Sequence, residues 1–234
     1  MQREIVLDTE TTGLKANGGD RLVEIGCIEM INRIPTGIEF HAFINPEGRE
    51  VHPEAEAIHG ISNAFLADKP AFHDIVGGFI EFIADDQLVI HNAPFDIGFI
   101  NMELLRIDQP PIMMERVVDT LALARRKHPA GPNTLDALCK RYGIDNTIRT
   151  KHGAIVDSLL LADVYVELLG ERQANLSLAQ NGRTSSARRN AAKAAQRPEP
   201  LPGRLTPEAL AEHDAFVETL GDKPIWKSFA SRDA

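Results

Sequence analysis

Two carboxylates stand two positions apart near the start of the chain. Asp8 and Glu10 close the apolar, β-branched run of IVLDTETTGL, which is typical of a β-strand. Side chains at positions i and i+2 of a strand point to the same face, so these two carboxylates repel each other. The pair therefore requires something positive beside it, and a bound cation is the simplest candidate.

Two further acids open helical patterns. Asp96 falls in the first turn after the apolar run LVIHNAPFD, and Asp157 lies early in KHGAIVDSLLLADVY, five residues after His152. Taken singly, each acid fits a structural role, because the helix macrodipole favours acids in a first turn. Taken with Asp8 and Glu10 at a strand end, they fall where open α/β sheets place their ligand sites.

The predicted site offers only oxygen ligands from its acids. Four carboxylates without a nearby cysteine suit hard divalent cations such as Mg²⁺ or Mn²⁺. The only cysteines, Cys27 and Cys139, lie in apolar stretches without metal-ligand spacing and are expected to be buried free thiols. The acids therefore predict a site for divalent metal ions.

The elements that must position these acids alternate between two periods. Runs with strand character cover residues 4–7, 22–31, 37–44, 88–91 and 117–119. Apolar residues at three- and four-residue spacing predict helices over residues 72–83, 95–105, 120–127, 135–142 and 154–169. Three early strands followed by alternation of strands and helices predict an α/β fold, with a mixed sheet flanked by helices.

The character of the chain changes after Gly170. Residues 171–204 are rich in Ala, Arg, Gln, Asn, Ser and Pro without an aromatic residue, which is typical of a flexible linker. A short helical pattern then returns, with Thr206 as N-cap and Pro207 at the first helical position. We expect a domain over residues 1–170, this linker, and a segment over 205–234 that docks on a partner, because a short isolated helix is marginal in water.

The charge of the chain is unevenly distributed. The net charge is −9, yet residues 172–204 hold seven Arg or Lys and only one acid, Glu199. The excess of acids therefore lies in the rest of the chain. Nucleic-acid binders usually show a basic footprint, so we expect the main domain to bind a polyanion weakly unless metal ions assist.

Signals for membrane insertion or export are not found. No apolar run approaches the ~20 residues of a membrane span, and Arg3 and Glu4 interrupt any signal-peptide pattern. The sequence therefore predicts a cytoplasmic protein.

Three segments resemble the motifs of a known family. DTETTGL, HNAPFD and HGAIVD match, in order, spacing and residue type, the exonuclease motifs of the DEDDh superfamily, whose fold is ribonuclease-H-like. With PEAEAIHGIS, residues 3–170 resemble the proofreading exonuclease subunits of bacterial replicative polymerases. The resemblance implies a 3'→5' exonuclease that removes mispaired nucleotides from a single-stranded or frayed DNA 3' end as 5'-monophosphates.

The resemblance also assigns roles to residues. It implies that two metal ions, Mg²⁺ or Mn²⁺, are held by Asp8, Glu10, Asp96 and Asp157. It makes His152 the general base that takes a proton from the attacking water. The residues that it places against the terminal nucleotide are Asp8, Glu10, Glu54, His59 and Asp157. From residue type alone, Glu54 and His59 are typical of surface positions in a Pro-bounded helical turn.

Two parts of the tail resemble partner-binding segments. QANLSL, residues 173–178, resembles the peptides that bind the sliding clamp, with Gln173, Leu176 and Leu178 in its pockets. A frayed helix end explains these six residues equally well. The terminal segment with Trp226 resembles the region that docks on the alpha subunit of DNA polymerase III, with docking on its own domain as the alternative. A small accessory subunit is a further partner that the sequence leaves open.

Three other functions compete with this interpretation. An RNA-trimming exonuclease would use the same catalytic set. An aspartyl-phosphate phosphatase would use DTETT as its nucleophile loop, but Glu10 stands where such loops carry a second Asp, and His152 and Asp157 stay unexplained. A non-catalytic adaptor between clamp and polymerase would leave the whole acidic set without a purpose. Metal-dependent cleavage of matched DNA and RNA separates these alternatives.

Overall fold

The computed structural model describes residues 2–149, 151–170 and 206–221. The chain divides into two compact units, and the described parts of these units are residues up to 170 and residues 206–221. The predicted linker, the clamp-type residues Gln173, Leu176 and Leu178, and Trp226 lie outside the described residues. Their predicted roles and the domain boundaries around them stay predictions.

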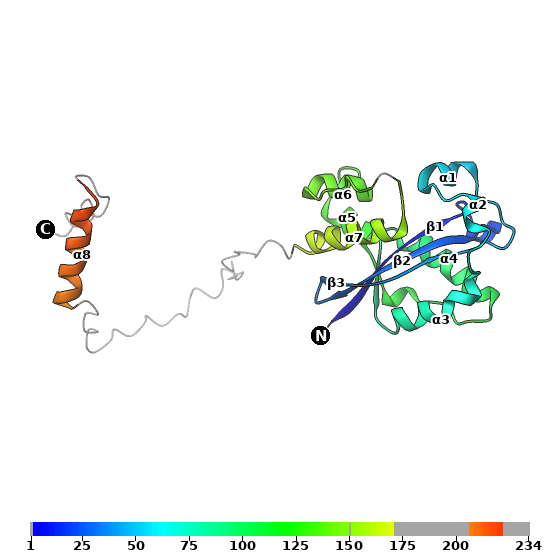
Figure 1. The fold of residues 1–234 in the computed structure, drawn as a ribbon, viewed down its shortest axis with the longest axis horizontal. Coiled ribbons are helices and arrows are strands. Elements are labelled where there is room, and N and C mark those ends of the chain that lie inside the picture. The colour runs from blue at the N-terminus through cyan, green and yellow to red at the C-terminus, as the bar shows by residue number, and fades with distance from the viewer. Residues whose placement is uncertain (1, 150, 171–205, 222–234) are drawn as a thin grey trace, which may run out of the picture. The chain divides into compact units, whose positions relative to one another are not determined.

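A mixed sheet of five strands forms the centre of the first unit (Figure 1). Its strands are β1 Arg3–Thr11, β2 Leu22–Ile31, β3 Ile34–Phe43, β4 Gln87–Ile90 and β5 Val117–Asp119. In the order β3-β2-β1-β4-β5, the pairs among β1, β2 and β3 are antiparallel, and β4 is parallel to both β1 and β5. This confirms the predicted mixed sheet, and β1 runs far enough to include Asp8 and Glu10.

The helices follow the predicted ranges closely. They are α1 Pro53–His59, α2 Asn63–Leu66, α3 Phe72–Ile83, α4 Ala93–Arg106, α5 Thr120–Lys127, α6 Leu135–Tyr142, α7 Ala154–Leu169 and α8 Pro207–Thr219. The two 3-10 turns are η1 Ala16–Gly18 and η2 Met114–Arg116. Helix α2 was not predicted. It has four residues, of which only Leu66 is buried, so it is too short to show a helical spacing of apolar residues.

The sheet is covered on both faces, and the alternation along β1 assigns its residues to them. Ile5 and Leu7 pack in the core under α3 and α4, whereas Val6 packs in the core under α5, α6 and α7. Because side chains alternate along a strand, Asp8 and Glu10 share the face of Val6. The two carboxylates therefore point to the side of the sheet that α7 covers.

Helix α8 shows the predicted capping. The Oγ1 atom of Thr206 accepts a hydrogen bond from the Ala209 amide at 3.2 Å, and Pro207 stands in the first turn. Of the residues in this helix only Val217 is buried, whereas Leu210 and Phe216 are exposed. Across the described part of the chain, every helix is too short or too polar to span a membrane.

Candidate active site

The four predicted acids converge from three elements. Asp8 and Glu10 lie on β1, Asp96 lies in the first turn of α4, and Asp157 lies in the first turn of α7. Burial raises the pKa of Asp8 well above its usual value, and Asp96, Glu10 and Asp157 raise it further, in that order. The structure therefore brings together carboxylates that are far apart in the sequence.

A left-handed residue sets the start of α4. Asn92, the N-cap, has φ 66° and ψ 46°, a conformation that Asn tolerates better than most residues. Its amide donates to Oδ1 of Asp119 at 3.2 Å, which fixes this turn against the end of β5. One turn later, Asp96 is buried and accepts a hydrogen bond of 2.7 Å from Oγ1 of Thr9. Thr9, the residue after Asp8 on β1, thus holds the Asp96 carboxylate in place.

Helix α7 approaches the sheet at Gly26, which is the register partner of Asp8. A Cβ atom on Gly26 would lie 2.5 Å from the amide nitrogen of Ile155 and 2.7 Å from the carbonyl oxygen of Ala154. The Oγ atom of Ser158 donates to the Gly26 carbonyl at 3.1 Å. Only glycine leaves room for the first turn of α7 so close to β2, and that turn carries Asp157.

Glu24 accepts a hydrogen bond from a free backbone amide at the start of the same helix. The N-cap Gly153 has no side chain, and the Ala154 amide donates instead to Oε2 of Glu24 at 3.2 Å. The other Glu24 oxygen is 2.7 Å from Nε2 of His41. Glu24 is buried and lies opposite Glu10 in the sheet. Sequence reasoning missed this residue, because its partner is 130 residues away in the chain.

Burial and mutual repulsion shift the acids in the same direction. Burial raises the pKa of Glu10 to about 8, with further contributions from Glu24, Asp157 and Asp96. Burial raises the pKa of Asp96 to about 7, against the hydrogen bond from Thr9 that lowers it. Carboxylates that resist ionisation in this way gain most from a nearby cation. The site is therefore built to attract positive charge.

One positive charge in the site comes from the protein itself. Arg149, between α6 and α7, has a side chain that is only 7 % exposed. Its guanidinium donates to both carboxylate oxygens of Asp157, to Nδ1 of His152 at 2.8 Å, and to Oδ2 of Asp136 at 2.7 Å. Arg149 also lowers the pKa values of Asp8 and Glu10. The sequence predicted a positive charge beside Asp8 and Glu10, but it did not indicate that Arg149 would supply part of it.

Three of these side chains can meet a single ion. Ligand atoms of Glu10, His152 and Asp157 lie within 4.8 Å of one another. His152 is 46 % exposed on its side chain, so solvent reaches the group. Carboxylate oxygens suit Mg²⁺ or Mn²⁺, and with Asp8 and Asp96 beside Glu10 and Asp157, the four acids fit hard divalent cations.

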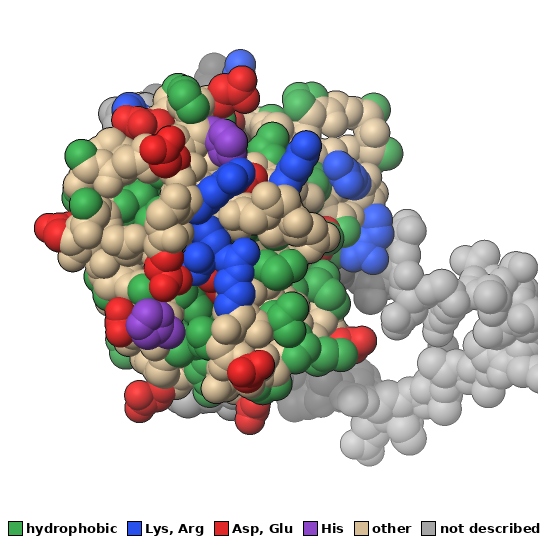
Figure 2. Space-filling model, turned by 90° about the vertical axis from the view of Figure 1, so that its right-hand side faces the viewer, with side chains coloured by type: hydrophobic (Ala, Val, Ile, Leu, Met, Phe, Trp, Pro, Cys, Tyr) green, Lys and Arg blue, Asp and Glu red, His purple; other side chains and the backbone are tan. Residues whose placement is uncertain are grey.

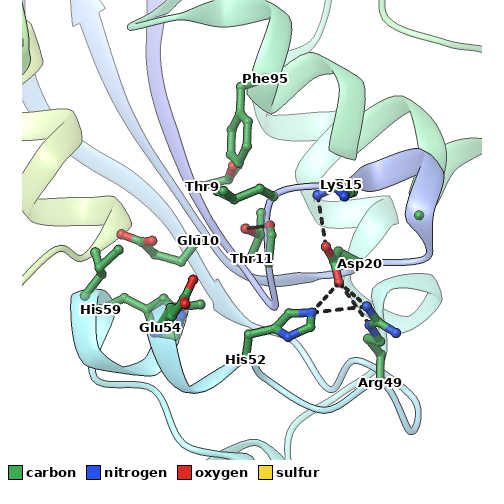
Figure 3. A pocket seen from close by; sticks show the side chains of 15 residues that line it. Thr9, Glu10, Thr11, Lys15, Asp20, Arg49, His52, Glu54, His59 and Phe95 are labelled. Carbon is green, nitrogen blue, oxygen red and sulfur yellow. Dashed lines mark hydrogen bonds and ion pairs between the residues drawn. The ribbon is translucent and has the colours of Figure 1, made fainter.

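A cavity of about 530 Å³ opens beside the acids (Figure 3). Glu10, Glu54 and His59 lie at one end of it, and the Asp20 carboxylate with its partner Arg49 lies at the other. A second cavity, of about 760 Å³, holds Asp8, Asp96, Asp157 and His152, and it shares Thr9, Glu10 and Phe95 with the first. A ligand in the first cavity would therefore reach the carboxylates directly.

His59 departs from the expectation of a surface residue, because it is buried, whereas Glu54 is exposed. Its Nδ1 atom accepts a hydrogen bond from the Ile61 amide at 3.0 Å, and burial lowers its pKa. The ring is therefore neutral with its proton on Nε2. That nitrogen lies near the Thr11 backbone but makes no hydrogen bond with any described residue. It is a buried donor without a partner in the lining of the first cavity.

Comparisons with known proteins agree with this geometry. The family model described as "Exonuclease" matches residues 5–165. DNA polymerase III subunit epsilon of Rickettsia felis is 46% identical over 222 residues, covering 93% of this chain and 96% of that protein.

Two solved structures are also similar. Exonuclease X in complex with 5' overhanging duplex DNA has a TM-score of 0.58 and 26% identity, covering 72% of this chain and 92% of that one. The nuclease domain of 3'hExo, a DEDDh family member bound to rAMP, has a TM-score of 0.63 at 13% identity, covering 73% of this chain and 92% of that one. The second likeness supports the fold.

Proposed function

The chain belongs to the exonuclease family and, within it, to the epsilon subunits of DNA polymerase III, and on this premise we propose that it proofreads DNA as a 3'→5' exonuclease. Water attacks the phosphorus of the terminal phosphodiester, and the bond from phosphorus to the 3' oxygen of the preceding nucleotide breaks. The products are a nucleoside 5'-monophosphate and a DNA strand with a new 3'-hydroxyl. The convergence of four acids beside a nucleotide-sized cavity carries this proposal.

The acids are proposed to hold two divalent cations, Mg²⁺ or Mn²⁺: Asp8, Glu10, Asp96 and Asp157. Such ions, when bound, supply the positive charge that an in-line phosphoryl transfer needs at the attacking and leaving oxygens. The raised pKa values of Glu10 and Asp96 support this role, because both carboxylates are buried and lie near other acids. His152, the exposed imidazole beside Asp157, is proposed to take the proton of the attacking water.

The first cavity is proposed to hold the terminal nucleotide. The buried Nε2 donor of His59 lies near the Thr11 backbone but forms no hydrogen bond among the described residues, so a polar group of the substrate would satisfy it. Phe95 and Ile58 provide apolar lining against which a base can pack. Glu10 and Glu54, at the same end as His59, are proposed to contact the sugar, next to the carboxylates of the reaction centre.

The surface also supports binding of a polyanion. Figure 2 shows Lys and Arg side chains gathered near the centre of the face seen from the right-hand side of Figure 1, with acidic side chains nearer its rim. A local basic region attracts a phosphate backbone even on a protein whose net charge is negative. The acidic excess of the sequence therefore does not argue against DNA as the substrate.

The decisive test is the release of nucleotide from a single-stranded DNA labelled in turn at each end. We expect release to begin at the 3' end in the presence of Mg²⁺ and to fall to background when a chelator removes the metal, because the acids then lack the positive charge that the transition state needs. Release that starts at the 5' end, or that persists in chelator, would contradict the proposal.

The same assay separates the remaining alternatives. A matched RNA oligomer cut faster than DNA would favour an RNA-trimming enzyme. Failure of folded, metal-loaded protein to cut either substrate would favour the adaptor. A stable phosphoenzyme on Asp8 would revive the phosphatase.

The tail is proposed to connect this enzyme to the replication machinery. In this proposal, residues 171–204 are a linker, Gln173, Leu176 and Leu178 bind the sliding clamp, and residues 205–234 bind the alpha subunit of DNA polymerase III. The exposed Leu210 and Phe216 on α8 support a docking role for the last segment. Tethering raises the local concentration of enzyme at the primer end to roughly the millimolar range.

Deletion of residues 205–234 is expected to abolish co-purification with the polymerase alpha subunit. Nucleotide release from single-stranded DNA should stay within about twofold of wild type, because the described contacts of the active site all lie within residues 2–170. Within α8, Phe216→Ser should weaken association, whereas the matched change Glu208→Ser on an exposed polar position should not. Undiminished co-purification of the truncated chain would disprove the role of the tail.

A further inference from the structure

Arg149 occupies the space between two side chains of the proposed metal site. Its Nη2 atom is 2.6 Å from Oδ2 of Asp157 and 2.8 Å from Nδ1 of His152, and these two acceptors are 3.4 Å apart. Its Nε atom donates to the remaining oxygen of Asp157. Asp157 and His152 belong, with Glu10, to the group whose ligand atoms lie within 4.8 Å of one another. One guanidinium nitrogen thus contacts two members of a group of three candidate ligands.

A guanidinium and a divalent cation oppose each other at these atoms, because both are positively charged. Both oxygens of Asp157 accept from Arg149, and a cation that coordinates them would also lie next to a fixed positive charge. Asp157 is buried, so its charge needs a partner at all times. The Asp157 carboxylate can therefore pair with Arg149 in the metal-free site and with a divalent cation after the metal binds.

The guanidinium has a second anchor that does not belong to the metal-binding group. Its Nη1 atom is 2.7 Å from Oδ2 of Asp136 on α6, and this carboxylate is 55 % exposed and bound on its other oxygen by Asn146. Asp136 can keep hold of Arg149 when the contacts to Asp157 break. The second anchor therefore lets the side chain change partners without leaving the cavity.

We propose that Arg149 is a positioning residue that competes with a divalent cation for Asp157 and binds His152 as long as it holds that carboxylate. The guanidinium holds both side chains until a cation binds, and then it turns toward Asp136 and the second cavity. The inference rests on the proposed function, because it assumes that the acids bind divalent cations. It assigns to Arg149 the task of keeping the site assembled and of setting how tightly the metal binds.

The exchange also affects the proposed base. An arginine N–H can only donate, so Nδ1 of His152 accepts in this contact and carries no proton. A neutral imidazole then carries its proton on Nε2, and neither nitrogen is free to accept one from water. Release of Arg149 by the cation would free Nδ1. In this way the proposed base becomes available when the metal has arrived.

The test is Mn²⁺ affinity, measured on the full chain by the electron paramagnetic resonance signal of free Mn²⁺. We expect Arg149→Met to bind Mn²⁺ roughly tenfold more tightly than wild type, because the competing charge is gone. In chelator, the same variant should melt several degrees lower, because Asp157 is then buried without a partner. A purely structural role for Arg149 would lower stability without tightening metal binding.

Two further variants make the test decisive. Arg126→Met removes the same charge from an exposed position on α5 and should change neither quantity. Arg149→Lys cannot bind the carboxylate through two nitrogens, so it should tighten Mn²⁺ binding less than Met does, and it serves if Arg149→Met does not fold. Equal or weaker Mn²⁺ binding by the Arg149 variants would overturn this inference alone. Lack of Mn²⁺ binding by wild type would overturn it together with the proposed metal site.

Discussion

Replacement of Asp8 by alanine is expected to lower nucleotide release from the DNA 3' end by at least about a thousandfold. Metal ions contribute several kcal/mol to a transition state of this kind, and ~1.4 kcal/mol corresponds to a factor of ten in rate. Asp8 interacts with Asp96, Glu10 and Asp157, so it lies at the centre of the acidic group. Its loss should impair the binding of both proposed cations at once. The measurement is the initial rate on 3'-labelled single-stranded DNA in saturating Mg²⁺.

The control for this prediction is the melting temperature of Asp8→Ala. It should rise while the rate of nucleotide release falls. Because the fold raises the pKa of Asp8, its ionised form destabilises the folded state increasingly as the pH rises above the unfolded value of about 4. In chelator, Asp8→Ala should therefore raise the melting temperature more at pH 8 than at pH 5. The exposed Asp85→Ala should change neither rate nor melting temperature. More than about a tenth of wild-type activity in Asp8→Ala would refute the central role of this carboxylate.

Replacement of Gly26 by alanine is expected to damage both fold and activity, although Gly26 carries no reactive group. The added methyl would meet the backbone of Ala154 and Ile155, which cannot give way as a flexible side chain would. Overpacking of this kind costs roughly 1–3 kcal/mol in the free energy of unfolding. A shift of the first turn of α7 also displaces Asp157, and a 1 Å misplacement at a reaction centre can cost about a hundredfold in rate.

Urea unfolding and single-stranded DNA cleavage of the same preparation would check this second prediction. The matched control is Gly77→Ala in α3, where an added Cβ meets no atom within 4 Å. That change should instead stabilise the protein by roughly 0.5–1 kcal/mol, because alanine is the better helix former. If Gly26→Ala unfolds at the wild-type urea concentration, the close approach of α7 to β2 is not as tight as the structure indicates.

Local periodicity is what made the fold predictable. The strands β2 and β5 and the helices α3, α5, α6 and α7 begin and end at the predicted residues, because apolar and β-branched runs mark the strands and apolar residues at three- and four-residue spacing mark the helices. Cys27 and Cys139 are buried free thiols, as predicted. The sequence also placed Asp96 and Asp157 correctly in the first turns of their helices.

Contacts between distant segments could not be predicted in this way. The hydrogen bond from Ala154 to Glu24, the packing of α7 against Gly26 and the contact of Arg149 with Asp157 depend on the assembled fold. Among the predicted site residues that the structure describes, His59 gave a misleading signal, since its helical turn suggested exposure while the structure buries it. Residue type and spacing predicted the acids of the candidate metal site. Long-range packing decides which other residues position or neutralise these acids.

The close contact between α7 and β2 has a consequence for genetics. A cell that loses proofreading accumulates mutations faster, and substitutions at Gly26 or Glu24 should have this effect even though neither residue is proposed to touch metal or DNA. Destabilisation by about 1–2 kcal/mol changes the abundance of a protein several-fold in cells. We therefore expect mutator alleles that depend on growth temperature to map to this contact, whereas alleles that remove a site carboxylate raise the mutation rate at every temperature.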